Sequence, residues 1–249
     1  MKPQNWNEQT IIITGGGDGL GFALAKRFHT TGATLALFDQ NAEKLEGAKN
    51  GLGDKTHIFA VDVTDANAVR DAVARVLEIN ERVDVLVNCA GITGRTNVQS
   101  HEVDLDDYDR VMNINARGSL ITSQAVLPSM LKRDYGRILH VASISGKEGN
   151  AGMLAYSMSK AAVVALAKVQ GKEYALTGVT INAIAPAVIR TEMVAALPDA
   201  QVKYMTDKIP MNRCGTRDEF ASMAMFIVSP DASFTTGFTW DLSGGRATY

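Results

Sequence analysis

The stretch that decides the fold is Thr10-Ile11-Ile12-Ile13-Thr14-Gly15-Gly16-Gly17-Asp18-Gly19-Leu20-Gly21. Its uninterrupted apolar run is typical of a strand that is buried on both faces of a parallel sheet. The glycines that follow permit a tight turn and let the backbone approach a pyrophosphate closely, and the helical pattern of Leu20–Thr30 offers unpaired N–H groups at its start. The stretch therefore predicts the first strand, phosphate-binding loop and helix of a dinucleotide-binding βαβ unit.

Short apolar runs and helical patterns go on alternating along nearly the whole chain. We expect seven strands, at Thr10–Thr14, Thr34–Phe38, His57–Val61, Val83–Val87, Arg137–Ala142, Val179–Ala185 and Thr239–Leu242. Helices are expected at Leu20–Thr30, Ala42–Asn50, Ala66–Asn80, Tyr108–Lys132, Met153–Leu176 and Arg217–Val228. Such alternation builds right-handed βαβ units. We predict an α/β Rossmann fold, with a doubly wound, parallel, seven-stranded sheet in a single domain over residues 1–249.

One long segment, residues 186–216, fits neither pattern. It contains three prolines and a short helical piece near Met193–Ala196. Ligands of open α/β sheets bind beyond the carboxyl ends of the strands, and this segment leaves one of those ends. We therefore interpret it as a lid. A solvent-exposed excursion without function is the alternative.

Composition and charge exclude several classes of function. The 249 residues include 25 Lys and Arg against 27 Asp and Glu, a net charge of −2, which favours neither nucleic acid nor an anionic membrane as a partner. The apolar stretch Ala161–Ala167 is too short to span a membrane, and the polar residues Met1–Glu8 do not resemble a signal peptide. Two cysteines and four scattered histidines give no metal-ligand spacing. We expect a cytoplasmic protein without a metal.

Two acidic residues bear on the choice of dinucleotide. Asp39 ends the second expected strand, 18 residues beyond Gly21, where a carboxylate accepts hydrogen bonds from the adenosine ribose of NAD. The same charge would repel the extra phosphate of NADP. Asp18 adds a second negative charge within the loop. The pattern predicts NAD; the alternative is that Asp39 only caps the next helix.

A tyrosine and a lysine stand one helical turn apart in Tyr156-Ser157-Met158-Ser159-Lys160. A free phenol has a pKa of about 10, and a neighbouring ammonium favours the phenolate, so this pair indicates acid–base catalysis. A second match, Tyr204 with Lys208, lies in the expected lid with no strand before it. We assign the chemistry to Tyr156.

These motifs resemble the short-chain dehydrogenase/reductase family over essentially the full length of the chain. The loop matches Thr-Gly-x-x-x-Gly-x-Gly, Asn88-Cys89-Ala90-Gly91 resembles the family's Asn-Asn-Ala-Gly, and Ser143 stands 13 residues before Tyr156 as in the family. The resemblance implies an NAD site formed by Thr14, Gly15, Gly17, Asp18, Gly19, Leu20, Gly21, Asp39, Asp62, Val63, Asn88, Ala90, Gly91, Tyr156, Lys160, Pro186, Ile189 and Thr191. Cys89 and Ala187 depart from the family pattern; we interpret Cys89 as a packing residue.

The resemblance also implies the roles of four catalytic residues. Tyr156 would be the general acid/base for an alcohol or carbonyl, and Lys160 would lower its pKa and hold the nicotinamide ribose. Ser143 would hydrogen-bond the substrate oxygen, and Asn115 would anchor a water that carries the proton onward. The family further implies a homotetramer, with the long helices Tyr108–Lys132 and Met153–Leu176 as packing faces.

By resemblance, the loops Gly91–Asn97, Ser143–Leu154 and Pro186–Pro210 would line the substrate pocket. The stretch Ile144–Gly152 is small and polar, which disfavours a steroid or a long acyl chain. The loops carry Arg95, Lys147 and Arg190, which could bind a carboxylate, and Ser145, a further expected substrate-binding residue. The alternative is that these cations are ordinary solvated charges. The predicted substrate is a polyhydroxylated acid.

The lid stretch Gln201–Pro210 and the ending Asp241–Tyr249 resemble a branch of the family that includes 2-keto-3-deoxy sugar acid 4-dehydrogenases acting on rhamnonate- or fuconate-derived acids. The alternatives are a 3-oxoacyl-carrier-protein reductase, a neutral polyol or sugar dehydrogenase, and a dinucleotide-sensing protein that has lost catalysis. The first would prefer NADP, and the last conflicts with the presence of Ser143, Tyr156 and Lys160.

Overall fold

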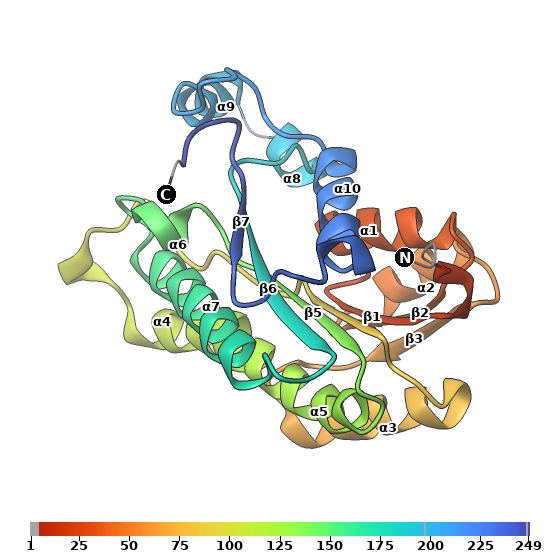
Figure 1. Cartoon of the computed structure of the whole chain (residues 1–249). Coiled ribbons are helices and arrows are strands. Elements are labelled where there is room, and N and C mark those ends of the chain that lie inside the picture. Colours follow the sequence, from red (N-terminus) through yellow and green to blue (C-terminus); the bar gives the residue numbers. More distant parts are fainter. Residues whose placement is uncertain (1–4, 197, 248) are drawn as a thin grey trace.

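The computed structural model describes residues 5–196, 198–247 and 249. Helices flank both faces of one parallel sheet, whose strand order is β3-β2-β1-β4-β5-β6-β7 (Figure 1). The strands are β1 (Thr10–Thr14), β2 (Thr34–Asp39), β3 (Thr56–Ala60), β4 (Val85–Asn88), β5 (Gly136–Val141), β6 (Val179–Pro186) and β7 (Thr239–Leu242). The predicted doubly wound, seven-stranded Rossmann sheet is confirmed. Residues 1–4, Leu197 of the expected lid and Thr248 near the chain end lie outside the described residues.

The central strand β1 shows why a continuous apolar run demands two helical layers. Ile11 and Ile13 belong to one buried cluster, with side chains from α1 (Gly19–His29), α2 (Ala42–Asn50) and α10 (Arg217–Ile227). Ile12 points to the opposite face and joins a cluster with α3 (Ala66–Asn80) and α5 (Gly118–Lys132). Because successive strand residues alternate between faces, both layers are needed to bury the run.

The long helix predicted over Tyr108–Lys132 differs from the expectation in two ways. It begins earlier, as α4 (Leu105–Met112), because the carboxylate of Asp104 accepts the backbone N–H of Asp106 at the helix start. A π-helical turn, Asn113–Arg117, then separates α4 from α5. Such turns often occur at functional sites, and no periodicity in the sequence reveals this one.

Two short helices beyond the carboxyl ends of the strands were not predicted. The segment 186–216 carries α8 (Glu192–Ala195), close to the expected piece, and also α9 (Asp199–Thr206) (Figure 1). A further helix, α6 (Ser145–Glu148), follows β5 and precedes α7 (Leu154–Glu173). Single 3-10 turns cover Trp6–Glu8, Ser100–Glu102 and Pro230–Ala232. Such helices are hard to predict from sequence, because they have too few turns to show a clear hydrophobic period.

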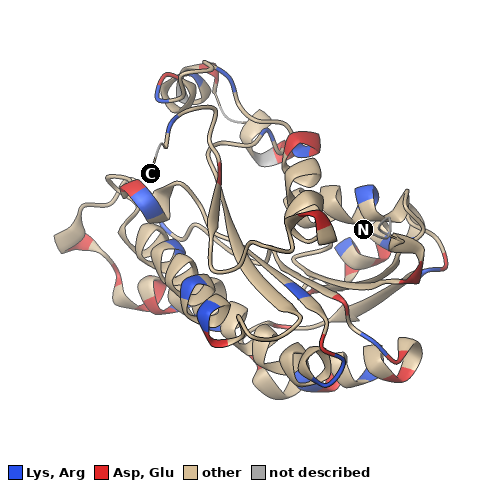
Figure 2. Ribbon diagram, viewed as in Figure 1, with Lys and Arg blue, Asp and Glu red and all other residues tan. Residues whose placement is uncertain are grey.

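Basic and acidic residues are interspersed along the ribbon in Figure 2, in keeping with the near-zero net charge. Within the described ranges, no helix is long and apolar enough to cross a membrane.

Candidate active site

A cavity of about 650 Å³ lies beyond the carboxyl ends of the strands. Sixteen of the predicted site residues line it: Gly15, Asp18, Gly19, Leu20, Gly21, Asp39, Asp62, Val63, Ala90, Gly91, Ser143, Tyr156, Lys160, Pro186, Ile189 and Thr191. Sequence positions from 15 to 191 therefore meet in one place, as expected for an open α/β sheet. The other predicted residues, Thr14, Gly17, Arg95, Asn88, Asn115, Ser145, Lys147 and Arg190, do not line it.

The glycine loop leaves no room for side chains at its two tightest points. A Cβ on Gly21 would lie 2.2 Å from the carbonyl oxygen of Gly15, and Gly15 itself has a φ of +63° and packs against the backbone of Ala90. The loop ends at Asp18, whose carboxylate accepts the N–H of Gly19 at the start of α1. The result is a backbone-lined hollow at a helix N-terminus, which suits a pyrophosphate.

Asp39 is held by the backbone on both of its oxygens. Oδ2 accepts the N–H of Gly17 at 3.2 Å, and Oδ1 accepts the N–H of Asn41 at 3.0 Å. The cap of α2 is Asn41, whose side chain accepts the N–H of Lys44. The alternative that Asp39 is itself the helix cap is therefore wrong. Its carboxylate lines the cavity and is preorganised there.

Asp18 contributes less negative charge to the cavity than the sequence indicates. Lys44 Nζ donates to Asp18 Oδ2 at 2.8 Å, and this hydrogen bond lowers the pKa of Asp18 below its usual value. The pair is half exposed and close to neutral as a unit. Asp39 thus carries the unbalanced charge of this part of the cavity, although Lys44 feels both carboxylates.

Thr14 and Asn88 support the cavity wall from behind. Thr14 Oγ1 accepts the N–H of Ala90 at 3.1 Å, which joins the end of β1 to the loop after β4. Asn88 is buried, accepts from Thr122 Oγ1 at 2.7 Å and lies 3.1 Å from His140 Nδ1. Burial lowers the pKa of His140 to about 4, so this imidazole is neutral and serves as a buried polar contact.

Tyr156 and Lys160 stand together at the floor of the cavity. The Nζ of Lys160 lies 5.8 Å from the centre of the Tyr156 ring and donates to the carbonyl of Val141 at 2.7 Å. Burial lowers the pKa of Lys160 to about 8. Burial raises the pKa of Tyr156, and a hydrogen bond to the Ser143 side chain opposes that rise. The pKa of Tyr156 is therefore raised in the protein alone, and not lowered as expected, because desolvation disfavours the phenolate.

Asn115 ties the cavity together from within the π-helical turn. Its Oδ1 accepts the N–H of Ile92 at 2.8 Å, and its Nδ2 donates to the carbonyl of Ile92 at 2.8 Å and to Ser159 Oγ at 2.9 Å. The side chain is buried and joins the loop after β4 to α7. Asn115 thus holds the helix that carries Tyr156 and Lys160.

None of the three cations predicted to read a carboxylate lines the cavity, and two of them are paired with acidic residues. Lys147 pairs with Asp241 at 2.8 Å, and Arg95 pairs with Asp104 at 3.1 Å. Arg190 is exposed and lies between the lining residues Ile189 and Thr191. Arg110 lines the cavity and was missed. It lies five positions before Asn115, a predicted catalytic residue, and that nearness in the sequence is the signal that could have identified it.

Other residues missed by sequence reasoning are neutral wall residues: Gln40, Val61, Ile114, Val141 and Ala142. Ile92, Thr93 and Gly94 also line the cavity and belong to the loop Gly91–Asn97, which was expected there. Cys89 also lines the cavity, and burial raises the pKa of its thiol to about 12. This thiol stays protonated near neutrality, which agrees with a packing role. The second tyrosine–lysine pair, Tyr204 and Lys208, is exposed and lies outside the cavity lining.

Fold and cavity together define a dinucleotide-binding oxidoreductase whose cavity is lined by a half-buried tyrosine, a buried serine and a buried lysine. The comparisons with known proteins agree: a family model described as enoyl-(acyl carrier protein) reductase matches residues 15–247. The chain is 43% identical, over 96% of its length and 95% of the relative, to 2-dehydro-3-deoxy-L-rhamnonate dehydrogenase (NAD(+)) of Sphingomonas sp. (strain SKA58). The chain belongs to the short-chain dehydrogenase/reductase family.

Two further similarities mark the width of this family. The chain is 34% identical to the 3-oxoacyl-[acyl-carrier-protein] reductase of Thermotoga maritima, over 95% of this chain and 97% of that protein. The solved structure of an NAD+-bound xylitol dehydrogenase has a TM-score of 0.92 and 30% identity, and covers 97% of this chain and 100% of that chain. The expected resemblance to sugar acid dehydrogenases is confirmed by the Sphingomonas relative.

Proposed function

We propose that this chain is an NAD-dependent oxidoreductase that interconverts the C4 hydroxyl and the C4 ketone of a 2-keto-3-deoxy-L-sugar acid. The observation that carries the proposal is the 43% identity with the rhamnonate-type dehydrogenase across nearly the whole of both chains. The carrier-protein reductases are less similar, at 34%. The names of the Sphingomonas relative and of the xylitol dehydrogenase structure both specify NAD as the cofactor.

The residues of the cavity fit an NAD molecule. The glycine loop at the start of α1 suits the pyrophosphate, because a side chain at Gly21 would collide with the backbone there. Asp39, with its orientation set by two backbone N–H groups, is placed to accept hydrogen bonds from the adenosine ribose. Asp62 and Val63 line the same cavity and suit the adenine.

The bound cofactor would supply the hydride chemistry: an acceptor as NAD for oxidation of the alcohol, and a donor as NADH for reduction of the ketone. Tyr156 takes the hydroxyl proton during oxidation and gives it back during reduction. Ser143 hydrogen-bonds Tyr156 and is placed to hydrogen-bond the reacting oxygen as well. Lys160 Nζ lies 5.8 Å from the centre of the Tyr156 ring, where a positive charge favours the phenolate. Asn115 keeps α7 and the loop after β4 in register. Burial makes each of these interactions stronger than it would be in water.

For the substrate carboxylate, Arg110 and Arg190 are the candidates. Arg110 lines the cavity, and its pairing with Asp107 at 2.7 Å leaves it 61% exposed. Arg190 lies on the segment 186–216, which we propose as a lid over the cavity. Replacing each by Ala should raise KM for the acid and leave KM for NAD unchanged. The matched change of Arg95, which is paired with Asp104, should have little effect.

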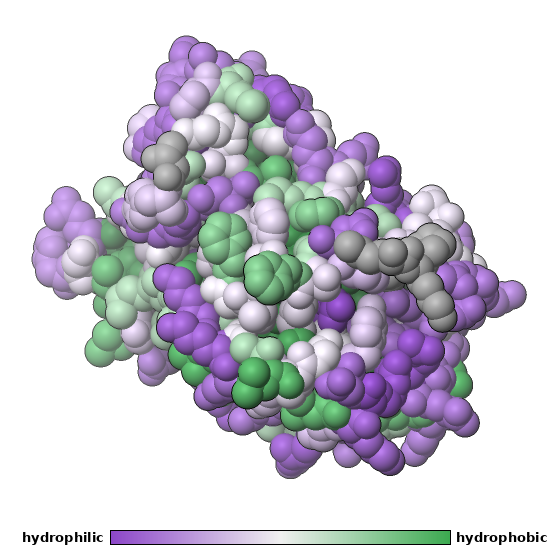
Figure 3. Space-filling model, in the orientation of Figure 1, coloured by the Kyte–Doolittle hydropathy of each residue, from purple (hydrophilic) through white to green (hydrophobic). Residues whose placement is uncertain are grey.

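We also propose a homotetramer in the cytoplasm. Figure 3 shows hydrophobic residues gathered on this face of the molecule. The exposed Phe226 of α10 and the exposed Phe238 pack against Trp240 of the edge strand β7, and Phe234 is exposed in the turn before it. On α7, Met158 and Val169 are likewise exposed. Two separate apolar faces are what a dimer of dimers needs. Sedimentation velocity or light scattering would test the assembly.

The experiment that tests the function is the rate of NADH formation from NAD with a 2-keto-3-deoxy-L-sugar acid. A neutral polyol and a β-hydroxyacyl thioester serve as comparison substrates. Rapid turnover of the acid alone supports the proposal. Preference for the polyol would favour the xylitol dehydrogenase-like alternative, and preference for the thioester would favour a carrier-protein reductase. Either result would overturn the substrate and leave the chemistry of Tyr156 in place.

A further inference from the structure

The C-terminal segment after β7 returns over the short helix α6 (Figure 1). Gly244 and Gly245 turn the chain with φ values of +60° and +88°. A Cβ on Gly244 would lie 2.6 Å from Ile209, so the turn also packs on the base of the proposed lid. The segment then runs beside α6, which directly follows Ser143.

Two ion pairs fasten α6, one to Asp241 within β7 and one to Arg246 of the segment after it. Lys147 Nζ pairs with Asp241 Oδ2 at 2.8 Å, and Arg246 pairs with Glu148 at 2.7 Å. The side chains of Lys147 and Arg246 are only 11% and 10% exposed. Their partners are separated from them by more than ninety positions in the sequence. Such sheltered pairs are far more sensitive to loss of one partner than surface pairs.

Arg246 also begins a series of hydrogen bonds that leads to the cavity. Its Nη2 donates to Asn150 Oδ1 at 2.9 Å, while its Nε donates to Glu148 Oε2 at 2.8 Å. Asn150 Nδ2 in turn donates to Ser145 Oγ at 2.6 Å, and the N–H of Ser145 donates to Ser143 Oγ at 3.1 Å. A continuous chain of hydrogen bonds thus runs from the C-terminal segment to the serine beside Tyr156.

A second branch reaches the helix of Tyr156. The N–H of Asn150 donates to Ser157 Oγ at 3.2 Å, and Ser157 is the neighbour of Tyr156 in α7. Asn150 follows Gly149, whose φ of +71° lets the chain turn back after α6. The same amide residue therefore bridges the loop of Ser143 and the first turn of α7, and Arg246 holds that residue.

We propose that Arg246 is a positioning residue for the reaction: through Asn150 it holds Ser143 and Tyr156 at the spacing that proton transfer requires. Arg246 does not line the cavity, and two of its nitrogens are bonded to protein acceptors, so it acts through its neighbours. The inference rests on the alcohol oxidation proposed above.

The test is Arg246→Ala and Arg246→Lys in the full-length protein, measured with the alcohol that the wild-type protein oxidises fastest. Displacement of reacting groups by a fraction of an ångström lowers kcat, and we expect a fall of roughly tenfold to a hundredfold for Arg246→Ala. KM for substrate and the Kd of NADH should stay within about twofold, because neither ligand touches Arg246. Arg246→Lys should fall between, since an ammonium cannot hold Glu148 and Asn150 in the same fork.

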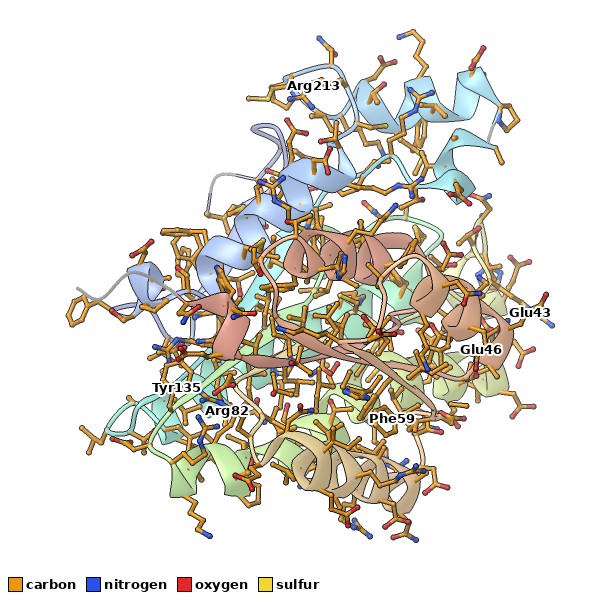
Figure 4. The ribbon with its side chains drawn as sticks, turned by 90° about the vertical axis from the view of Figure 1, so that its right-hand side faces the viewer. Glu43, Glu46, Phe59, Arg82, Tyr135 and Arg213 are labelled. Atoms are coloured by element: carbon orange, nitrogen blue, oxygen red, sulfur yellow. The ribbon has the colours of Figure 1, made fainter. Side chains whose placement is uncertain are left out.

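Two further experiments distinguish a positioning role of Arg246 from a merely stabilising one. Arg82→Ala removes a similar arginine–carboxylate contact, with Asp84 at 2.7 Å; Arg82 lies beside Tyr135, far from the segment that carries Arg213 (Figure 4). This control should lower the melting temperature and leave kcat unchanged. Adding guanidinium at low millimolar concentration to the Arg246→Ala protein should restore part of kcat and leave that of the Arg82→Ala protein as it was.

Two results would overturn the proposal. If Arg246→Ala lowers only the melting temperature, Arg246 merely stabilises the fold. If it raises KM for substrate with kcat intact, Arg246 binds the substrate directly. If the Arg246→Ala protein is too unstable to assay, the same measurements on Arg246→Lys and Asn150→Ala decide between these roles. If the wild-type protein does not oxidise the sugar acid, only the proposed function is overturned. The variants are then compared with the polyol as substrate, so the role of Arg246 is still tested.

Discussion

Replacement of Asp39 by Ala is the sharpest test of how this protein selects its dinucleotide. The carboxylate accepts the N–H groups of Gly17 and Asn41 at 3.2 and 3.0 Å, which fixes its orientation toward the cavity. Asp18, the other acidic group of this region, is paired with Lys44. Removal of Asp39 therefore removes the unbalanced negative charge and the acceptor for the adenosine ribose in one step.

The expected magnitude follows from the hydrogen bonds that are lost. A hydrogen bond to a charged group contributes about 1.5–3 kcal/mol, and each 1.4 kcal/mol corresponds to about tenfold. We expect kcat/KM for NAD to fall by roughly tenfold to a hundredfold, mainly through KM, because this contact is equal in ground and transition states. With NADP, kcat/KM should rise, since the repulsion of the 2′-phosphate is gone and Lys44 remains nearby.

The assay is the steady-state formation of reduced cofactor, followed by absorbance, with NAD and NADP on the same substrate. The matched control is Asn41→Ala, which removes the cap of α2 and should lower stability by about 1 kcal/mol without altering the cofactor ratio. An unchanged ratio of NAD to NADP activity in Asp39→Ala would refute the reasoning, and so would an equal change in both variants.

Three further predictions concern the groups buried around the cavity. Tyr156→Phe should abolish turnover and leave NADH affinity, measured by fluorescence titration, nearly intact; retained turnover would remove Tyr156 from the mechanism. For His140, burial lowers the pKa from 6.5 to about 4, so the unfolded chain binds the extra proton first, and stability conferred above pH 6.5 is lost as the pH falls toward 4. Urea unfolding should show roughly 2 kcal/mol of this loss between pH 6.5 and 5, and a His140→Asn protein that loses just as much would contradict it. Because the pKa of Cys89 is raised to about 12, iodoacetamide at pH 7.5 should leave activity unchanged; rapid inactivation that Cys89→Ala prevents would show a reactive thiol instead.

Much of the fold could be predicted because its signals are local. Buried parallel strands require apolar runs such as Ile11–Ile13, and the glycine loop predicts the turn into α1. The same holds for the spacing of Tyr156 and Lys160, which one helical turn brings together. The helices α6 and α9 were missed because four and eight residues show too little periodicity.

By itself, the sequence determined the order of the elements, the phosphate loop, Asp39 and the tyrosine–lysine pair, since each depends on neighbours within a few residues or on one βαβ unit. Only the tertiary structure decided what the cations do. Lys147 is paired with Asp241 and Arg246 with Glu148, while Arg110 lines the cavity. A long charged side chain pairs with the opposite charge that the fold brings near it, and the partners of Lys147 and Arg246 lie more than ninety positions away in the sequence.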